Sequence, residues 1–235
     1  MIQNCRNALF ARVSRVRRDE RGVTLSELIV TIALMTMLLA MVMTIFITFT
    51  RTFADERSAT SNTAGATVAM NELTRVIRAG TPIPKGPSLP NDPVFSYAAA
   101  NQIVLQAYLD TDAADPEPVK VEFLITSDRT LVERRWTAIK SGGLFTFQPA
   151  VASERTVVRQ ISNGTTPVFR YFNASNIELE PPAGGQLTAA QRNAVAAVKI
   201  SMTVQTDPSG RAKTASIENT VGIPNLDLSR IGIDR

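Results

Sequence analysis

The sequence contains no histidine and a single cysteine, Cys5. Without histidine the chain cannot form a Ser/His/Asp or Cys/His triad or a histidine-based zinc site. If the N-terminal segment is removed, the rest has no thiol for a disulfide or for nucleophilic catalysis. No glycine-rich phosphate loop and no pair of carboxylates in an identifiable cleft is present either. We therefore expect a protein that is not an enzyme and has no cofactor.

The net charge of the chain comes from one segment. The formal net charge is +4, and the first 22 residues contain six arginines against two acidic residues. The remaining 213 residues therefore carry 19 basic and 19 acidic side chains, a net charge of zero. Such a balance provides no overall field for binding a polyanion such as nucleic acid. The basic excess belongs to an N-terminal leader.

A long apolar run follows the leader. Val23–Thr50 is 28 residues long and contains one ionisable side chain, Glu27. This exceeds the roughly 20 residues that a membrane-spanning helix needs, and the arginines before it predict a cytoplasmic leader and an exported C-terminal part. A conventional cleaved signal has a shorter apolar core followed closely by a small-x-small site. Two interpretations remain: an uncleaved signal anchor, or a signal that is cut before the apolar run.

Glu27 raises the free energy of placing such a segment in a membrane. An intramembrane carboxylate costs on the order of 2.5–3.5 kcal/mol on insertion scales, and such residues usually have a partner. One interpretation is that Glu27, close to the cytoplasmic end, extends to the lipid headgroups. The other is that it pairs with a positive charge on a neighbouring chain, which would also fix the register between the two chains.

The junction resembles a known processing signal. Arg21-Gly22 ends the basic leader, and "VTLSE" then opens the apolar helix. This arrangement resembles the cleavage and methylation signal of type IV prepilins and type II secretion pseudopilins. The resemblance implies that a prepilin peptidase cuts after Gly22, that Val23 becomes the methylated N-terminus, and that Glu27 is the carboxylate used in assembly. Two departures are Val23 in place of the more usual Phe or Met, and an apolar helix without proline.

The segment after the apolar run predicts a continuation of the helix. Residues 51–79 contain apolar side chains at i, i+3 and i+4 spacing, which indicates a helix with one buried face. We expect one helix over residues 23–79, with a transmembrane half over 23–50 and a weak stretch near 55–65. Residues 80–93 hold five of the thirteen prolines and predict an extended connector.

Residues 94–235 predict an exported β domain. Apolar and polar residues alternate most clearly over 103–109, 119–126 and 196–205. Weaker strand candidates are 130–140, 144–148, 155–161, 167–172 and 213–222. We expect one antiparallel sheet of about six to eight strands with the amphipathic helix packed on it, an α+β fold resembling the pilin ladle. The segments "LVERRW", "VFRYF" and "NAVAAVKISMTVQT" are similar in order to minor pilins of the PilW type and to J-type pseudopilins.

Two sets of residues are candidate binding sites. Asp110, Asp112 and Asp115 share one loop, but the loop lacks the glycine and the terminal glutamate of an EF-hand. They are weak calcium candidates, and a solvated acidic loop is favoured. Arg134-Arg135-Trp136 and Phe169-Arg170-Tyr171-Phe172 interleave cations with aromatics, as single-strand binders do. Because strand residues alternate between faces, packing is favoured over nucleic-acid contact.

The sequence thus predicts a non-enzymatic subunit, of the minor pilin or pseudopilin kind, of a type IV pilus or a type II secretion-like filament. Its implied partners are a prepilin peptidase, other subunits bound through their N-terminal helices, and an inner-membrane assembly platform. It would cross the cytoplasmic membrane once and end in a periplasmic or cell-surface filament. Two alternatives stay open: a signal-anchored domain that binds DNA or a surface, and a signal-anchored exported enzyme.

Overall fold

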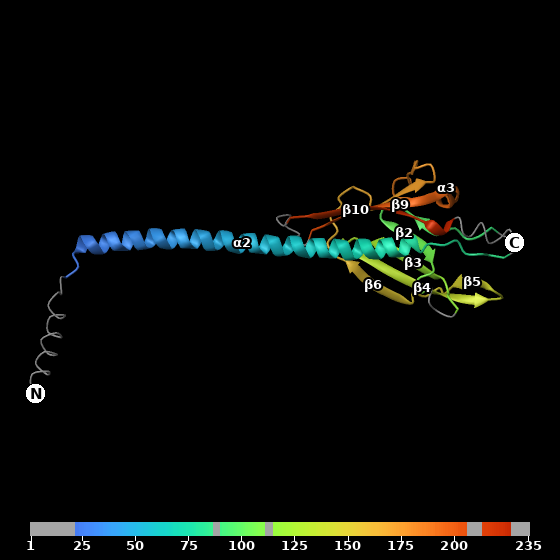
Figure 1. The fold of residues 1–235 in the computed structure, drawn as a ribbon, viewed down its shortest axis with the longest axis horizontal. Coiled ribbons are helices and arrows are strands. Elements are labelled where there is room, and N and C mark those ends of the chain that lie inside the picture. The colour runs from blue at the N-terminus through green and yellow to red at the C-terminus, as the bar shows by residue number, and fades with distance from the viewer. Residues whose placement is uncertain (1–21, 87–89, 111–114, 206–212, 227–235) are drawn as a thin grey trace, which may run out of the picture. The chain divides into compact units, whose positions relative to one another are not determined.

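The computed structural model describes residues 22–86, 90–110, 115–205 and 213–226 (Figure 1). The chain forms two compact units, Met1–Phe53 and Ala54–Arg235. One helix, α2 (Leu25–Arg78), contributes to both units. Together with the antiparallel sheets that follow it, α2 makes the chain an α+β protein with a pilin-like arrangement of elements, as the sequence predicts.

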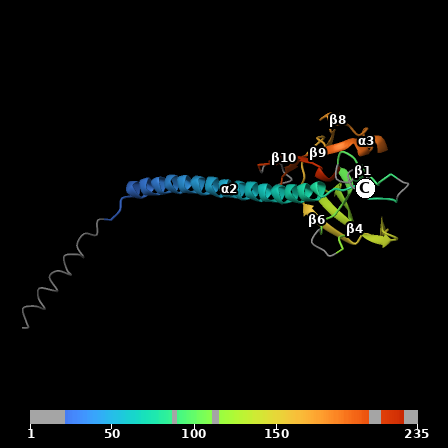
Figure 2. The same cartoon turned by 45° about the vertical axis from the view of Figure 1, so that its right-hand side comes forward.

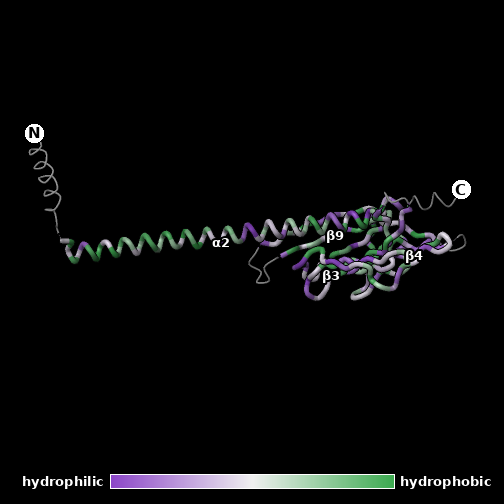
Figure 3. The backbone as a smooth tube through the Cα atoms, turned by 90° about the horizontal axis from the view of Figure 1, so that it is seen from below, coloured by the Kyte–Doolittle hydropathy of each residue, from purple (hydrophilic) through white to green (hydrophobic). Residues whose placement is uncertain are grey.

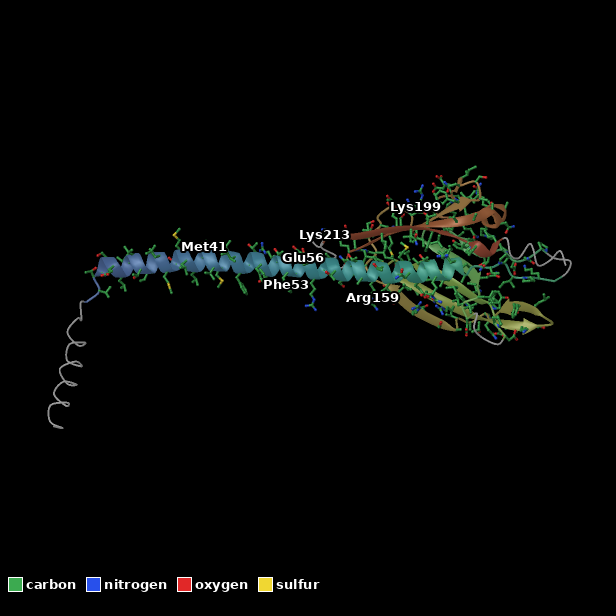
Figure 4. All side chains as sticks on the ribbon, in the orientation of Figure 1. Met41, Phe53, Glu56, Arg159, Lys199 and Lys213 are labelled. Atoms are coloured by element: carbon green, nitrogen blue, oxygen red, sulfur yellow. The ribbon has the colours of Figure 1, made fainter. Side chains whose placement is uncertain are left out.

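In the first unit, the exposed side chains of α2 are mostly apolar. Every described residue up to Phe53 is exposed, and Figure 3 shows mostly hydrophobic residues along this part of α2, with less hydrophobic positions between them. Side chains such as Met41 and Phe53 point away from the helix (Figure 4). Within the described part of the chain, α2 is the one helix long and apolar enough to cross a membrane. Its length and composition suggest a membrane anchor.

The threonines of this apolar segment do not leave their hydroxyl groups unpaired. Thr31 donates to the carbonyl of Leu28, and Thr44 donates to the carbonyl of Ala40, each at 2.8 Å. Hydroxyl groups that bond to the preceding turn need no water, so they are tolerated in a lipid environment. The threonines therefore do not conflict with a membrane-embedded helix.

In the second unit, the C-terminal part of α2 buries one face. Its buried residues are Asn62, Ala66, Ala69, Met70, Leu73, Val76 and Ile77. The weak stretch expected near residues 55–65 is helical throughout. Asn62 lies in that stretch, is fully buried and donates to the carbonyl of Lys213 at 2.9 Å. Local propensity is low there, but this contact with the domain stabilises the helical form.

Gly80 ends the helix for a steric reason. Its amide donates to the carbonyl of Ile77 at 3.1 Å, and a Cβ added to Gly80 would lie 2.7 Å from the Val94 side chain. Only glycine allows the chain to turn this close to Val94. The proline-rich segment then lies against the domain, since Ile83 is buried and bridges Asp92.

The β domain contains two antiparallel sheets, so the expectation of a single sheet is wrong. The large sheet has the order β1 (Phe95–Ala98), β2 (Gln102–Ala107), β3 (Val119–Ile125), β4 (Leu131–Ser141) and β5 (Leu144–Phe147), and β6 (Ser153–Val158) also pairs with β4. The small sheet has the order β10 (Ala215–Gly222), β9 (Val195–Val204), β7 (Phe169–Asn173) and β8 (Glu178–Leu179). Alternation identifies a strand but carries no information about its neighbour, which is why the sequence did not separate the sheets.

All eight segments with alternating polarity form strands, with shifted ends. The sequence missed β1 and β8, which are four and two residues long, because alternation cannot be recognised over so few positions. A short helix, α3 (Ala189–Ala194), precedes β9 and is capped by Thr188 and Gln191. A 3₁₀ turn, Pro224–Leu226, follows β10.

The core lies between the buried face of α2 and the two sheets. Figures 1 and 2 show β9 and β10 on one side of this part of α2 and β4 and β6 on the other. Phe95, Phe123, Phe169 and Tyr171 are the largest fully buried side chains. The Tyr171 hydroxyl donates to the carbonyl of Ala99 at 2.7 Å and so joins the small sheet to the end of β1. Burial raises the pKa of Tyr171 well above its ordinary value.

Candidate functional site: the start of the N-terminal helix

The predicted processing residues lie directly before α2. Gly22 and Val23 precede the helix, which begins at Leu25 rather than at Val23. The hydroxyl oxygen of Thr24 accepts a hydrogen bond from the amide of Glu27 at 3.3 Å, and its carbonyl accepts one from Leu28 at 3.0 Å. Thr24 is therefore the N-cap of the helix.

This cap places Glu27 at the third helical position, where a carboxylate is favoured. The N-terminal end of a helix carries a partial positive charge that stabilises an anion by about 0.3–1 kcal/mol. The threonine-x-x-glutamate spacing of Thr24 and Glu27 is a sequence signature of a helix start, from which the position of this helix start could have been predicted. The contribution is smaller than the roughly 2.5–3.5 kcal/mol that a membrane carboxylate costs, so the helix end alone does not explain Glu27.

The surface around Glu27 has no packing partner within the described part of the chain. Leu25, Leu28, Ile29 and Val30 are all more than half exposed. A continuous apolar surface of this kind requires lipid or other helices around it. The first unit therefore combines an apolar helix, one carboxylate near its N-terminus, and a short exposed segment before it.

Residues 17–43 match the model of the prokaryotic N-terminal methylation motif. The chain carries a prepilin-type N-terminus. This is consistent with a type IV pilin or pseudopilin, and it indicates a structural, pilin-like protein. The matched residues include Gly22, Val23 and Glu27, whereas the β domain lies outside the match. No curated protein matches the chain.

The acidic loop does not form a metal site among the described residues. Asp110 is exposed, Asp112 lies outside the described residues, and Asp115 forms an ion pair with Lys140. Residues 22–86, 90–110, 115–205 and 213–226 contain no group of three or more potential metal ligands. The hydrogen bond that Lys140 donates to Asp115 raises the pKa of the Lys140 ammonium group above its ordinary value.

The arginines considered for nucleic-acid contact are held by carboxylates of the same chain. Arg134 pairs with Glu154 at 2.6 Å, Arg135 pairs with Glu133, and Arg170 pairs with Glu178 through two hydrogen bonds. The hydrogen bond from Arg170 lowers the pKa of Glu178 below its ordinary value. These three arginines therefore already have carboxylate partners within the chain.

Arginines and aromatic side chains are only partly separated between the two faces of these strands. Phe169 and Tyr171 are buried on one face of β7, opposite Arg170. Phe172, however, is two residues from Arg170 and shares its face, and it is only partly buried. On β4, Arg134 and Trp136 likewise lie on one face.

An ion cluster between α2 and the large sheet was not predicted. The Glu133 side chain is fully buried on β4 and accepts a hydrogen bond from Arg155 on β6 at 2.7 Å, in addition to its bond from Arg135. Glu72 on α2 lies 2.6 Å from Arg155 and 3.1 Å from Arg135. Burial raises the pKa of Glu72, but the hydrogen bond from Arg75 and the nearby arginine charges outweigh it, so the pKa lies below its ordinary value. The cluster fixes α2 on β4 and β6.

Proposed function

We propose that the chain is a structural subunit of a type IV pilus or a type II secretion-like filament, cleaved after Gly22 and assembled through α2. The observation that carries the proposal is the match to the methylation motif on a helix whose first 29 residues are exposed and contain only two charged side chains, Glu27 and Arg51. After cleavage, Glu27 would be the fifth residue of the mature chain. The β domain would be exported.

The proposed assembly contact pairs two charged groups, each of which would be unfavourable in the membrane without a partner. Cleavage creates an amine at Val23, and Glu27 of a neighbouring subunit would accept that charge inside the apolar helix bundle. Each group offsets the desolvation of the other, and the pair fixes the axial register of the helices. The partners of this step are a prepilin peptidase, other subunits and an inner-membrane assembly platform.

We further propose that the subunit is a minor component without enzymatic activity. The order of three strand segments supports this, because it is similar to PilW-type minor pilins and J-type pseudopilins. Sheared filaments from cells with and without prepilin peptidase test the proposal. The subunit is expected in the filaments, at low copy number relative to the main subunit, only when the peptidase is present. Its absence from filaments in both strains would refute the filament proposal.

Gly22→Val is expected to block processing. In the proposed signal glycine directly precedes the cut, and valine would place a branched side chain there, so the variant should retain the 22-residue leader and stay out of filaments. Val23→Phe is the matched control, since it changes the adjacent residue and is expected to be cleaved as efficiently as the parent. Immunoblots that resolve the precursor from the mature chain measure both. Equal cleavage of Gly22→Val and the parent would contradict the assigned site.

A further inference from the structure

The end of the large sheet carries a projecting hairpin. The pairing of β3 with β4 ends at Thr137, whereas β4 continues to Ser141 and pairs there with β5 alone. Gly142 and Gly143 form the turn, with φ of 59° and 80°, values that suit a tight two-residue hairpin. Residues 138–147 therefore form a two-stranded projection, labelled by β5 in Figure 1.

Both faces of this hairpin carry apolar side chains. Phe145 and Phe147 lie opposite Lys140 and Ala138 on the face that carries Trp136. On the other face, Ile139 is 39% exposed and Leu144 is 37% exposed. The described residues beyond α2 contain four exposed large apolar side chains: Ile139, Leu144, Val151 and Ile177. Because three of the four lie within or just after the hairpin, it is the most apolar projection of the domain.

The opposite end of the same sheet face borders a groove. The groove has a volume of about 690 Å³ and is lined by the turn between β1 and β2 and by residues 180–185. Its apolar walls include Tyr97, Leu124 and Pro181. Leu124 shares a face of β3 with Lys120, which lies at the base of the hairpin. The two positions are roughly 13 Å apart along the strand, so the hairpin and the groove occupy opposite ends of one surface.

One charged side chain beside the hairpin and one in the groove form no salt bridge with any described residue, and their charges are opposite. The Lys120 ammonium lies 4.5 Å from the centre of the Trp136 ring, and it has no carboxylate partner within the described residues. Glu180 lines the groove and likewise forms no salt bridge with any described residue. The Arg170–Glu178 pair in the groove is balanced, so Glu180 leaves the groove one negative charge in excess.

We propose that the β4–β5 hairpin of one copy docks in the 690 Å³ groove of a second copy of this chain. The hairpin would bury Leu144 and Phe145 against the apolar walls, and Lys120 would face Glu180. Because different surfaces meet, the contact is head-to-tail and does not close on itself, so it would join a run of adjacent copies of any length, including the short runs that a minor component forms. The inference rests on the proposed filament function and adds a contact between β domains to the contact between helices.

Disulfide trapping in membranes tests this contact on the full chain, expressed at a level that brings copies together. The background is Cys5→Ser, which leaves no other thiol. Leu144→Cys on the hairpin and Ala183→Cys on the groove are both exposed in the parent. Under mild oxidation, co-expressed single variants are expected to give dimers only, and the double variant a ladder of oligomers. The control pair Thr214→Cys and Ala183→Cys should give no ladder.

Charge exchange provides the second arm of the test. Lys120→Glu or Glu180→Lys alone is expected to lower the yield of cross-linked product several-fold, and the two together to restore it. No ladder from Leu144→Cys/Ala183→Cys would overturn the contact, as would dimers from Leu144→Cys alone, which would mean that two hairpins meet. The N-terminus of the same samples is determined by mass spectrometry. Processed Val23 without a ladder refutes only the docking proposal, whereas an unprocessed leader refutes the filament function.

Discussion

Glu27→Ala is expected to abolish incorporation into filaments while cleavage after Gly22 continues. Alanine removes the acceptor for the charged amine at Val23, which would then be unpaired among apolar helices. A charge left unpaired there costs on the order of 2.5–3.5 kcal/mol, and at 1.4 kcal/mol per factor of ten this is roughly a 100-fold loss for each contact. Quantifying the subunit in sheared filaments, relative to the amount of cleaved subunit in membranes, measures the effect.

Two further variants separate the pairing role from helix capping. Glu27→Gln keeps the length and polarity of the side chain but removes its charge, so it should fail in the same way as Glu27→Ala. If stabilisation of the helix start were the main role, the loss would be limited to about 0.3–1 kcal/mol. Glu56→Ala is the control, because Glu56 is an exposed carboxylate on α2 beyond the apolar segment (Figure 4). Normal incorporation of Glu27→Gln would contradict the pairing.

Glu133→Ala is expected to lower the free energy of unfolding by about 2–3 kcal/mol. The variant removes two charge-assisted hydrogen bonds, each worth about 1.5–3 kcal/mol. The sum is discounted because Arg135 and Arg155 are 30% and 53% exposed and can bind water instead. Urea unfolding of the purified protein in detergent, followed by the fluorescence of Trp136, the only tryptophan, measures the change.

Glu154→Ala is the matched control for the buried carboxylate. Glu154 pairs with Arg134 between the same two strands, but its side chain is 53% exposed. Its loss is expected to cost at most about 1 kcal/mol, as for other surface ion pairs. If Glu133→Ala and Glu154→Ala destabilised the protein equally, burial of Glu133 would not be the reason for its contribution.

The sequence predicted those features that depend on neighbouring residues. The prepilin-type junction at Gly22 is local, and the spacing of Leu73, Val76 and Ile77 shows the buried face of α2. The strands with clear alternation were found in the same way. These predictions agree with the structure because each depends only on residues within one or two helical turns or along a single strand.

The features that the sequence missed depend on residues that are distant along the chain. Glu133 meets Arg155 across a strand pair, and Arg135 meets Glu72, 63 positions away. The alternation of apolar and polar residues along β4 does not identify the cation that lies opposite Glu133. It also does not indicate that the strands divide into two sheets. The cap of Thr24 on Glu27 is different, because its spacing was visible and could have predicted the helix start.

The most direct test of the proposed function is the N-terminus of the mature protein. Mass spectrometry of the protein from membranes of cells with and without prepilin peptidase determines it. The account predicts an N-methylated Val23 in the presence of the peptidase and an intact leader in its absence. An intact leader in both strains would contradict the account and identify α2 as an uncleaved signal anchor for the exported β domain.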